Sequence, residues 1–465
     1  MITKFIERHF AINTTLNYTL TLMRNKLIIC LFSIVTTIEP ISAQLLNESD
    51  LLFLKEMTID VLEDSKIKEN QSISPDFGPN NTGGILIRPG GRDCYPAFWI
   101  RDYAMSLDCG FVSPKDQLHM LKLTAATQCD QTWITKGGSM IPSGAIADHV
   151  RIDDSLPIFF PGTYSFEGQG TDSWGKVPPY SDQFFFIHMA HYYVKSTGQK
   201  KVLNSIINGF RLIDRLEWAF KVPPSHLDNH IVYTTEHFRG VDFGFRDAQV
   251  ITGDLCIASV FKYKASIEMA ELFKLLGNKE KSVEYQSIAE KLKKAIPETF
   301  CDDRGMLCAS TGMSSQADVW STVLAVFYGI LEEDLLAKTC STLADAYKTG
   351  TLAYKGNIRH ILTSDDFSES TAWEHSFSTI NTYQNGAYWG TPTGWTCYAI
   401  AKADIELARQ LAREYIENLR ENDYRKGEMF GEPYECINPD GHKQNPVYLT
   451  TVTCPFHVFT KYFNN

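Results

Sequence analysis

The stretch that decides the fold is residues 254–296, DLCIASVFKYKASIEMAELFKLLGNKEKSVEYQSIAEKLKKAI. Apolar residues recur in it at the three- and four-residue spacing of an amphipathic helix, without the strict alternation of a half-buried strand. The pattern breaks once, at Gly277-Asn278, where a glycine suits the C-terminus of a helix. We therefore predict two helices joined by a tight turn, one over 254–276 and one over 279–296.

The same helical spacing extends along most of the chain. The predicted helices come mostly in pairs, and long loops rich in Gly, Pro, aromatic and acidic residues separate the pairs. Such long loops in a compact domain are usually functional. The further helices are expected at 51–66, 103–126, 182–197, 202–220, 315–330, 332–348, 392–403, 404–421 and 447–463, and the long loops at 67–98, 128–181, 222–253, 298–314, 349–391 and 422–446.

Six long loops between helical hairpins predict a closed ring, an all-α (α/α)6 barrel with its long loops on one face. The alternative is an open helical array, which would need regular repeats of about 34–47 residues. The periods in this chain are longer and irregular, so the sequence favours the closed ring. We expect one barrel domain over residues 44–465.

The N-terminal segment predicts export. A short basic stretch, Met23–Lys26, precedes a short apolar run over Leu27–Val35, and Ile41-Ser42-Ala43 ends on a small residue. This order is typical of a secretory signal peptide cut near Ala43. The apolar run is too short and too interrupted to span a bilayer, so no stable membrane insertion is expected after cleavage. We assign residues 1–43 to the signal peptide and its upstream segment, and predict a secreted or periplasmic protein.

Composition narrows the classes of ligand. The chain is 44% hydrophobic and 21% charged, which is ordinary for a globular protein with a large core. Its formal net charge of −11 argues against nucleic acid or an anionic membrane as partner. The sequence contains no CxxC pair and no cysteine and histidine cluster of the zinc type, so we predict no metal and no cofactor.

The first segment with site chemistry is Phe98-Trp99-Ile100-Arg101-Asp102-Tyr103, at a junction between a loop and a helix. Aromatic faces stack on the apolar C–H surface of sugar rings, while Arg and Asp side chains can each bind two hydroxyls. Trp99, Arg101 and Asp102 are therefore candidates for substrate binding. The alternative for Asp102 is a helix N-cap.

Two further segments supply carboxylates. Asp242 lies beside phenylalanines in the loop before the helix at 254–276, an environment that raises a carboxyl pKa towards that of a general acid. Arg246 could fix the Asp242 rotamer or bind substrate. Near the C-terminus, Glu432 and Glu435 precede a turn, where a carboxylate could activate water. Taken alone, these glutamates are equally compatible with a solvated surface turn.

Together, and in this order, the segments resemble the six-hairpin glycosidases, and most of all glycoside hydrolase family 63 and its trehalase relatives. In family 63 a G-x-D-x-x-x-R motif carries the general acid, and the last motif, a Glu followed by Asn-Pro and a glycine turn, carries the base. The matching residues are Phe98–Asp102 for the aromatic and acidic motif, Gly240, Asp242 and Arg246 for the acid motif, Asn385–Gly390 with Thr393, Gly394 and Trp395 for a Gly and Trp segment, and Glu435, Asn438, Pro439 and Gly441 for the last motif.

The chain departs from the family 63 pattern at three points. The usual Trp-Asp of the first motif is Arg101-Asp102, which is reminiscent of the glucoamylase group, and Phe and Gly follow Asp242. The last motif has one residue fewer between its Pro and Gly. Asp247 also competes with Asp242 for the role of acid, and Glu432 competes with Glu435 for the role of base. These departures leave the identity of the substrate sugar undetermined.

The resemblance implies hydrolysis of an oligosaccharide with inversion, in which Asp242 protonates the glycosidic oxygen and Glu435 deprotonates a water. Inversion requires the two carboxyl groups to lie about 6.5–9.5 Å apart. A glycoside phosphorylase on the same barrel and a non-catalytic glycan-binding protein are the alternatives. Substrate binding is assigned to Trp99, Arg101, Asp102, Arg246, Trp389, Trp395 and Glu432.

Overall fold

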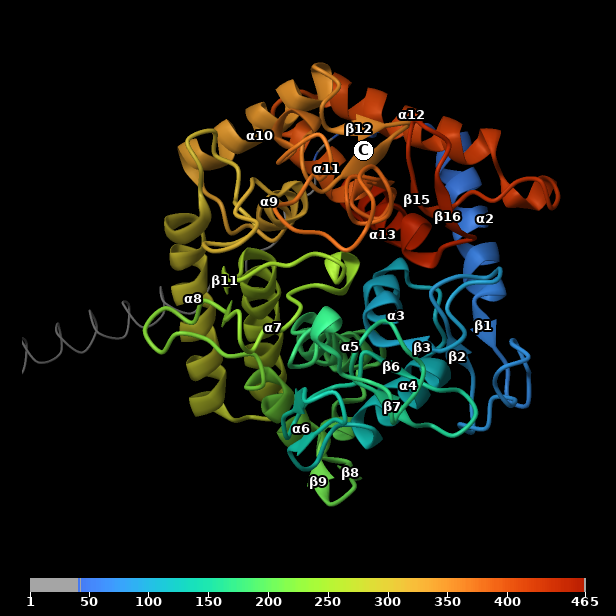
Figure 1. The fold of residues 1–465 in the computed structure, drawn as a ribbon, viewed down its shortest axis with the longest axis vertical. Coiled ribbons are helices and arrows are strands. Elements are labelled where there is room, and N and C mark those ends of the chain that lie inside the picture. Colours follow the sequence, from blue (N-terminus) through green and yellow to red (C-terminus); the bar gives the residue numbers. More distant parts are fainter. Residues whose placement is uncertain (1–40, 42, 464–465) are drawn as a thin grey trace, which may run out of the picture. The chain divides into compact units, whose positions relative to one another are not determined.

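The computed structural model describes residues 41 and 43–463, so most of the predicted signal peptide lies outside the described residues. Helices dominate this part of the chain. Twelve α-helices, α2 to α13, alternate between an outer and an inner ring (Figure 1). None of the described helices has the length and apolar character needed to cross a membrane. The outer helices are α2 (Glu48–Asp64), α4 (Pro114–Ala126), α6 (Leu212–Phe220), α8 (Lys279–Phe300), α10 (Glu333–Lys348) and α12 (Ile405–Glu421).

The inner ring closes on itself. Each inner helix packs against the next, and α13 packs against α3, which completes the circle. This closure confirms the predicted (α/α)6 barrel over an open array. The inner helices are α3 (Ile100–Ser106), α5 (Ser181–Thr197), α7 (Cys256–Leu275), α9 (Val319–Phe327), α11 (Thr393–Ala401) and α13 (Leu449–Lys461).

Burial explains which helices lie inside. Every residue of α9, VWSTVLAVF, is buried, so this helix must be surrounded by protein. In α12 the buried residues recur at helical spacing, as in Ala408, Leu411, Ala412 and Tyr415, and the remaining face is left to solvent. A helix with one apolar face can cover the barrel but cannot stand inside it.

Two predicted helices are shorter than expected. The single helix expected over 103–126 is two, because the chain turns at Gly110 with φ 83° and restarts at α4, where Ser113 caps the helix and Pro114 occupies its first position. Of the helix expected over 202–220, only α6 is α-helical. Asn208-Gly209, both with positive φ, instead form the turn of a hairpin between β8 and β9.

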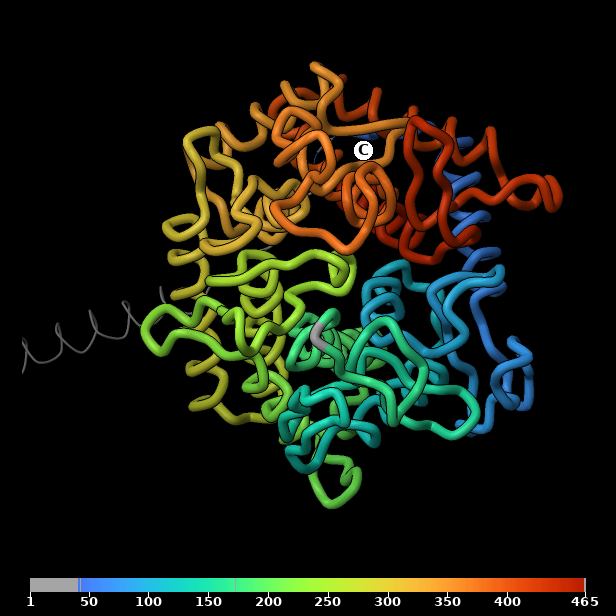
Figure 2. Tube along the Cα trace, in the orientation of Figure 1, coloured from blue at the N-terminus to red at the C-terminus, as the bar shows by residue number. Residues whose placement is uncertain are grey.

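Short strands order the long loops. The largest sheet is antiparallel throughout, in the order β12-β13-β14-β15-β16, and a second sheet has the order β3-β6-β7. The strands are β1 (Lys66–Ile67), β2 (Leu86–Ile87), β3 (Phe98–Trp99), β4 (Trp133–Ile134), β5 (Met140–Ile141), β6 (His149–Val150), β7 (Pro157–Ile158), β8 (Ile206–Ile207), β9 (Phe210–Arg211), β10 (Tyr233–Thr234), β11 (Gly253–Asp254), β12 (Ala353–Tyr354), β13 (Asn357–Arg359), β14 (Tyr388–Trp389), β15 (Tyr434–Ile437) and β16 (Lys443–Pro446). Figure 2 follows these connections from one hairpin to the next.

Candidate active site

A cavity of about 210 Å³ lies at the N-terminal ends of the inner helices α3 and α13. Arg101 and Asp102 enter it from the first turn of α3, and Tyr448 enters from the residue before α13. Three carboxylic acids, Asp102, Asp247 and Glu435, share this cavity with a set of aromatic rings. The lining comprises Pro89, Tyr95, Trp99, Arg101, Asp102, Pro161, Gly162, Trp174, Gly244, Phe245, Asp247, Tyr383, Glu435, Gln444 and Tyr448.

Glu435 lies on β15 and is held by donors on both of its oxygens. Asn445 Nδ2 donates to Oε2 at 2.5 Å, and the Tyr95 hydroxyl lies 3.2 and 3.3 Å from Oε1 and Oε2. The side chain is 2% exposed, and this burial is the main reason that its pKa is raised to about 8, with the negative charge of Asp102 adding to the effect. The donors fix the orientation of the carboxyl group.

Asp247 directly follows the 3-10 turn Gly244–Arg246, in the same loop as Asp242. Gln384 Nε2 donates to its Oδ1 at 2.9 Å. Burial raises its pKa to about 7, against the opposing attraction of Arg101. Gly244 lets this loop approach closely, because a Cβ there would lie 1.9 Å from Arg101 Nε. Asp247 is therefore a rigidly placed carboxyl group that titrates near neutral pH.

Asp102 is the third carboxyl group of the cavity. Its Oδ1 accepts a hydrogen bond from the Tyr448 hydroxyl at 2.7 Å, and Tyr448 also reaches Glu435. Burial raises the Asp102 pKa to about 6, although Arg101 acts in the opposite direction. The hydroxyl of Tyr448 thus links two carboxyl groups that come from opposite ends of the chain.

Arg101 lines the cavity with its charge already paired. Its Nη1 donates to Asp148 at 2.5 Å and to Asp182 at 3.2 Å, and both acids are fully buried. Its guanidinium also lies over the Trp99 ring, 5.1 Å from the centroid. Arg101 therefore connects the segments that carry Asp148 and Asp182, and one face of the Trp99 ring packs against its guanidinium group.

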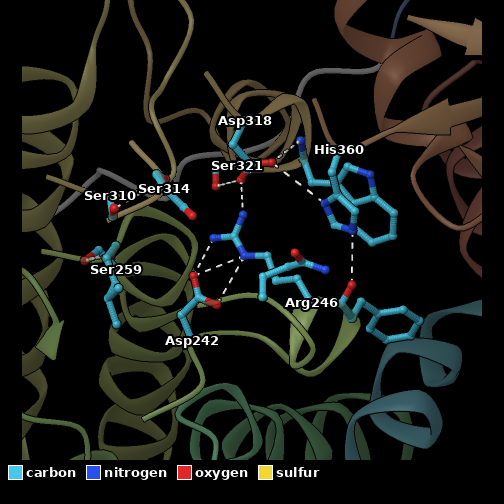
Figure 3. A network of polar contacts seen from close by, with 12 residues as sticks. Asp242, Arg246, Ser259, Ser310, Ser314, Asp318, Ser321 and His360 are labelled. Atoms are coloured by element: carbon cyan, nitrogen blue, oxygen red, sulfur yellow. Dashed lines mark hydrogen bonds and ion pairs between the residues drawn. The ribbon is translucent and has the colours of Figure 1, made fainter. Parts of the chain in front are cut away.

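Asp242, the predicted general acid, does not line the cavity. Arg246 Nη2 donates to it at 2.5 Å, and Arg246 Nη1 donates to Asp318 at 2.5 Å, so the guanidinium bridges two buried carboxylates (Figure 3). Asp318 in turn caps the N-terminus of α9 through Trp320 and Ser321. The role of Asp242 as general acid stays a prediction. Its carboxylate is paired with Arg246 outside the cavity lining, whereas Phe245 and Asp247 of the same loop line the cavity.

Four other predicted binding residues also lie outside the cavity lining. Arg246 is fully buried in the network just described. Glu432 accepts hydrogen bonds from Asn418 of the outer helix α12, at 2.7 Å, and from its neighbouring backbone, so Glu435 alone of the two glutamates reaches the cavity. Trp389 is 0% exposed and packs against Phe245, Trp320 and His360, and Trp395 belongs to α11. The structure makes these tryptophans part of the barrel core.

Several lining residues had no recognisable sequence signal. Tyr95 lies three residues before the Phe98–Tyr103 segment, and Tyr448 directly precedes the last helix, so proximity to a motif or helix start could have found them. Trp174 ends a short 3-10 helix, Tyr383 lies in an irregular loop, and Gln444 lies in the short strand β16. Only tertiary contacts bring them to the cavity.

Comparisons with known proteins agree with this architecture. Residues 222–357, which include Asp247, match the bacterial alpha-L-rhamnosidase six-hairpin glycosidase domain. The structure is similar to a rhamnosidase from Klebsiella oxytoca with rhamnose bound, with a TM-score of 0.52, 12% identity, and coverage of 91% of this chain and 65% of that chain. Residues 222–357 are therefore similar to a six-hairpin glycosidase domain, and the chain shares its fold with a glycosidase of known structure. Among curated proteins, no match to this sequence was found.

Two other six-hairpin glycosidases have the same fold. The glycoside hydrolase family 63 mannosylglycerate hydrolase from Thermus thermophilus, in complex with glucose, gives a TM-score of 0.54 at 10% identity, over 87% of this chain and 99% of that one. The glucoamylase from Saccharomycopsis fibuligera gives a TM-score of 0.55 at 11% identity, over 92% and 98%. At these identities the likeness concerns the fold. It confirms the six-hairpin resemblance that the sequence motifs predicted.

Proposed function

We propose that this protein is an exported glycoside hydrolase that cleaves an O-glycosidic bond with inversion, with Asp247 as general acid and Glu435 as general base. One observation carries the proposal: carboxyl groups from two loops far apart in the sequence share one buried, aromatic cavity. Glycosidases of both stereochemical classes work through such a pair. Asp247 replaces Asp242 as the acid because Asp242 is engaged by Arg246 outside the cavity.

The order of motifs assigns different roles to the two carboxyl groups, because Glu435 matches the glutamate of the last motif, which carries the base in the family that the sequence resembles. Asp247 lies beside Phe245, and burial raises its pKa to about 7, so it keeps a share of its protons near neutral pH. Burial raises the pKa of Glu435 further, to about 8, so the pKa values by themselves do not distinguish acid from base. Glu435 has donors from Asn445 and Tyr95, which stabilise its carboxylate while it takes a proton from water. Asp102 and Trp99 remain candidates for holding the sugar through its hydroxyls and its apolar face.

The cavity chemistry favours a neutral sugar. Among the described residues of the lining, Arg101 is the one cationic side chain, and it already pairs with Asp148 and Asp182. Three carboxyl groups disfavour an anionic ring such as a uronic acid. Phosphorolysis is disfavoured as well, because Arg101, the cationic side chain that could hold phosphate there, is already paired with Asp148 and Asp182.

The decisive experiment is an activity screen combined with matched variants. The panel begins with α-L-rhamnosides, because of the family match, and continues with α-glucosides and α-mannosides, with product anomers followed by NMR. On the best substrate, Asp247→Asn should lose about two to four orders of magnitude in kcat. It should keep much of its activity on an aryl glycoside with a good leaving group, because that bond needs no protonation.

Glu435→Gln should lose turnover on both substrates, since water still needs its base. Glu432→Gln is the matched control and should keep the chemistry. Phosphate-dependent product release would instead establish a phosphorylase. Binding without turnover across the panel would establish a glycan-binding protein, and either result would reject hydrolysis.

Export is a separate part of the proposal and rests on the N-terminal sequence. Expression of the full chain in a host with a general secretion pathway should release protein whose N-terminus begins just after Ala43. Retention of residues 1–43 on protein recovered from the cells would reject it.

A further inference from the structure

The inner helices α5 and α7 carry matching pairs of ligand-type side chains. His188 and His191 lie three residues apart on α5, and Glu268 and Glu271 lie three residues apart on α7, so each pair occupies one helix face. The two helices pack against each other. One ligand atom each from His188, His191 and Glu268 lies within 4.8 Å of the other two.

The imidazole rings are oriented for a shared ion. Glu268 Oε1 lies 2.7 Å from His188 Nδ1 and 3.6 Å from His191 Nδ1. The outer nitrogens face other carboxylates, because His191 Nε2 is 2.8 Å from Glu271 and His188 Nε2 is 3.5 Å from Asp108. Histidines that bind metal ions typically donate their second N–H to a carboxylate in this way.

Glu268 offers an independent sign of a missing partner. It is 5% exposed, and its second oxygen, Oε2, is buried without a hydrogen-bond partner in the described part of the chain. A buried carboxylate oxygen with no donor is a ready ligand for a cation.

A cation already occupies part of this arrangement. Lys264 Nζ lies 2.6 Å from His188 Nδ1 and 2.6 Å from Glu268 Oε1, while those two acceptors are 2.7 Å apart. His188 Nδ1 donates to Glu268 Oε1 in one tautomer and accepts from the Lys264 ammonium in the other. The Lys264 side chain is 20% exposed and lies one helical turn before Glu268, so its ammonium can turn out to solvent.

We propose that His188, His191 and Glu268 form a zinc site between α5 and α7, in which the Lys264 ammonium holds the place of the metal ion when zinc is absent. Two imidazoles and one carboxylate match the N and O ligands that zinc prefers, with water in the remaining position. Zinc binds histidine nitrogen at about 2.0–2.1 Å, so atoms already within 4.8 Å need only small side-chain rotations.

The site is separate from the carboxylate cavity. His188 follows Asp182, which anchors Arg101 at the cavity, by six residues, or about 9 Å along the helix at 1.5 Å per residue. A zinc ion there would link the inner helices α5 and α7. Its role is therefore structural, and it can be tested without a known substrate.

The test measures zinc directly. Purified protein, stripped with a chelator, is titrated with Zn²⁺ by calorimetry, and bound zinc is counted by elemental analysis after dialysis. We expect about one Zn²⁺ per chain and a rise in Tm on binding. His191→Gln should weaken binding by at least about tenfold, and Lys264→Met should tighten it, because the competing ammonium is gone. His226→Gln, at a histidine elsewhere in the chain, is the matched control.

Spectroscopy covers the case in which a variant fails to fold. Cobalt substituted into the wild-type chain should give the d–d absorption of a tetrahedral N and O site, and zinc X-ray absorption should show two imidazoles. Absence of stoichiometric zinc in both the wild type and Lys264→Met would overturn the proposal, as would equal binding by His191→Gln and His226→Gln. Neither result bears on Asp247 and Glu435.

Discussion

Replacing Asp242 by Asn tests which of the two candidate acids, Asp242 or Asp247, protonates the leaving group. The substitution removes a 2%-exposed carboxylate that accepts hydrogen bonds from Arg246 Nε and Nη2, and leaves the buried guanidinium with Asp318 as its remaining anion. Removing one partner of a buried pair costs roughly 3–5 kcal/mol of unfolding free energy. At about 2.1 cal/mol/K of unfolding entropy per residue, that corresponds to a fall in Tm of roughly 3–6 °C for a barrel of this size.

Asp247→Asn should show the opposite pattern. The new amide can still accept the hydrogen bond from Gln384, and no buried cation loses its only partner, so stability should change by less than about 1 kcal/mol. The loss should appear in kcat, by about two to four orders of magnitude.

The assay pairs calorimetric Tm with kcat measured well below Tm for both variants and the wild type. Asp242→Asn should be less stable yet keep kcat within about tenfold of the wild type, provided the loop from 242 to 247 stays anchored. A fully stable Asp242→Asn protein with kcat reduced a thousandfold or so would restore Asp242 as the acid and refute this reading of the cavity.

Three further predictions follow from the same contacts. The pKa of Glu435 is about 8 in the folded chain, against an ordinary value of 4.5. Between these pH values the unfolded chain has lost a proton that the folded chain keeps. The free energy of unfolding therefore falls as pH rises through that window. Glu435→Gln should therefore gain Tm over the wild type at pH 8.5 and not at pH 4, and an equal Tm difference at both would contradict the raised pKa. Tyr448→Phe removes a donor to Asp102, worth about 1.5–3 kcal/mol of stability, so Tm should fall by roughly 2–3 °C, and an unchanged Tm would exclude the link. Trp389→Phe should lower stability by about 1–3 kcal/mol and leave KM unchanged, whereas a KM effect alone would return Trp389 to substrate binding.

Local pattern was enough to place most helices. The apolar spacing of 254–296 and the break at Gly277-Asn278 correspond to α7 and α8, whose observed bounds are Cys256–Leu275 and Lys279–Phe300. Prediction was less accurate where a turn signal lay inside a periodic stretch, as at Gly110 and Asn208-Gly209. At those points the backbone geometry of a few residues outweighed the periodicity.

What the sequence by itself determined is the barrel and the two loops that carry the proposed acids, because helical periodicity, loop length and motif order are all local or sequential properties. It could not choose between Asp242 and Asp247, or between Glu432 and Glu435, since each pair lies within one short segment and is chemically alike. The tertiary structure distinguishes the members of each pair through partners that are distant in sequence. Outside the cavity, Asp318 binds Arg246, the partner of Asp242, and Asn418 binds Glu432. Within the cavity, Gln384 binds Asp247 and Tyr95 binds Glu435. A carboxylate's role depends on which charges and donors surround it, and that environment exists only once the ring has closed.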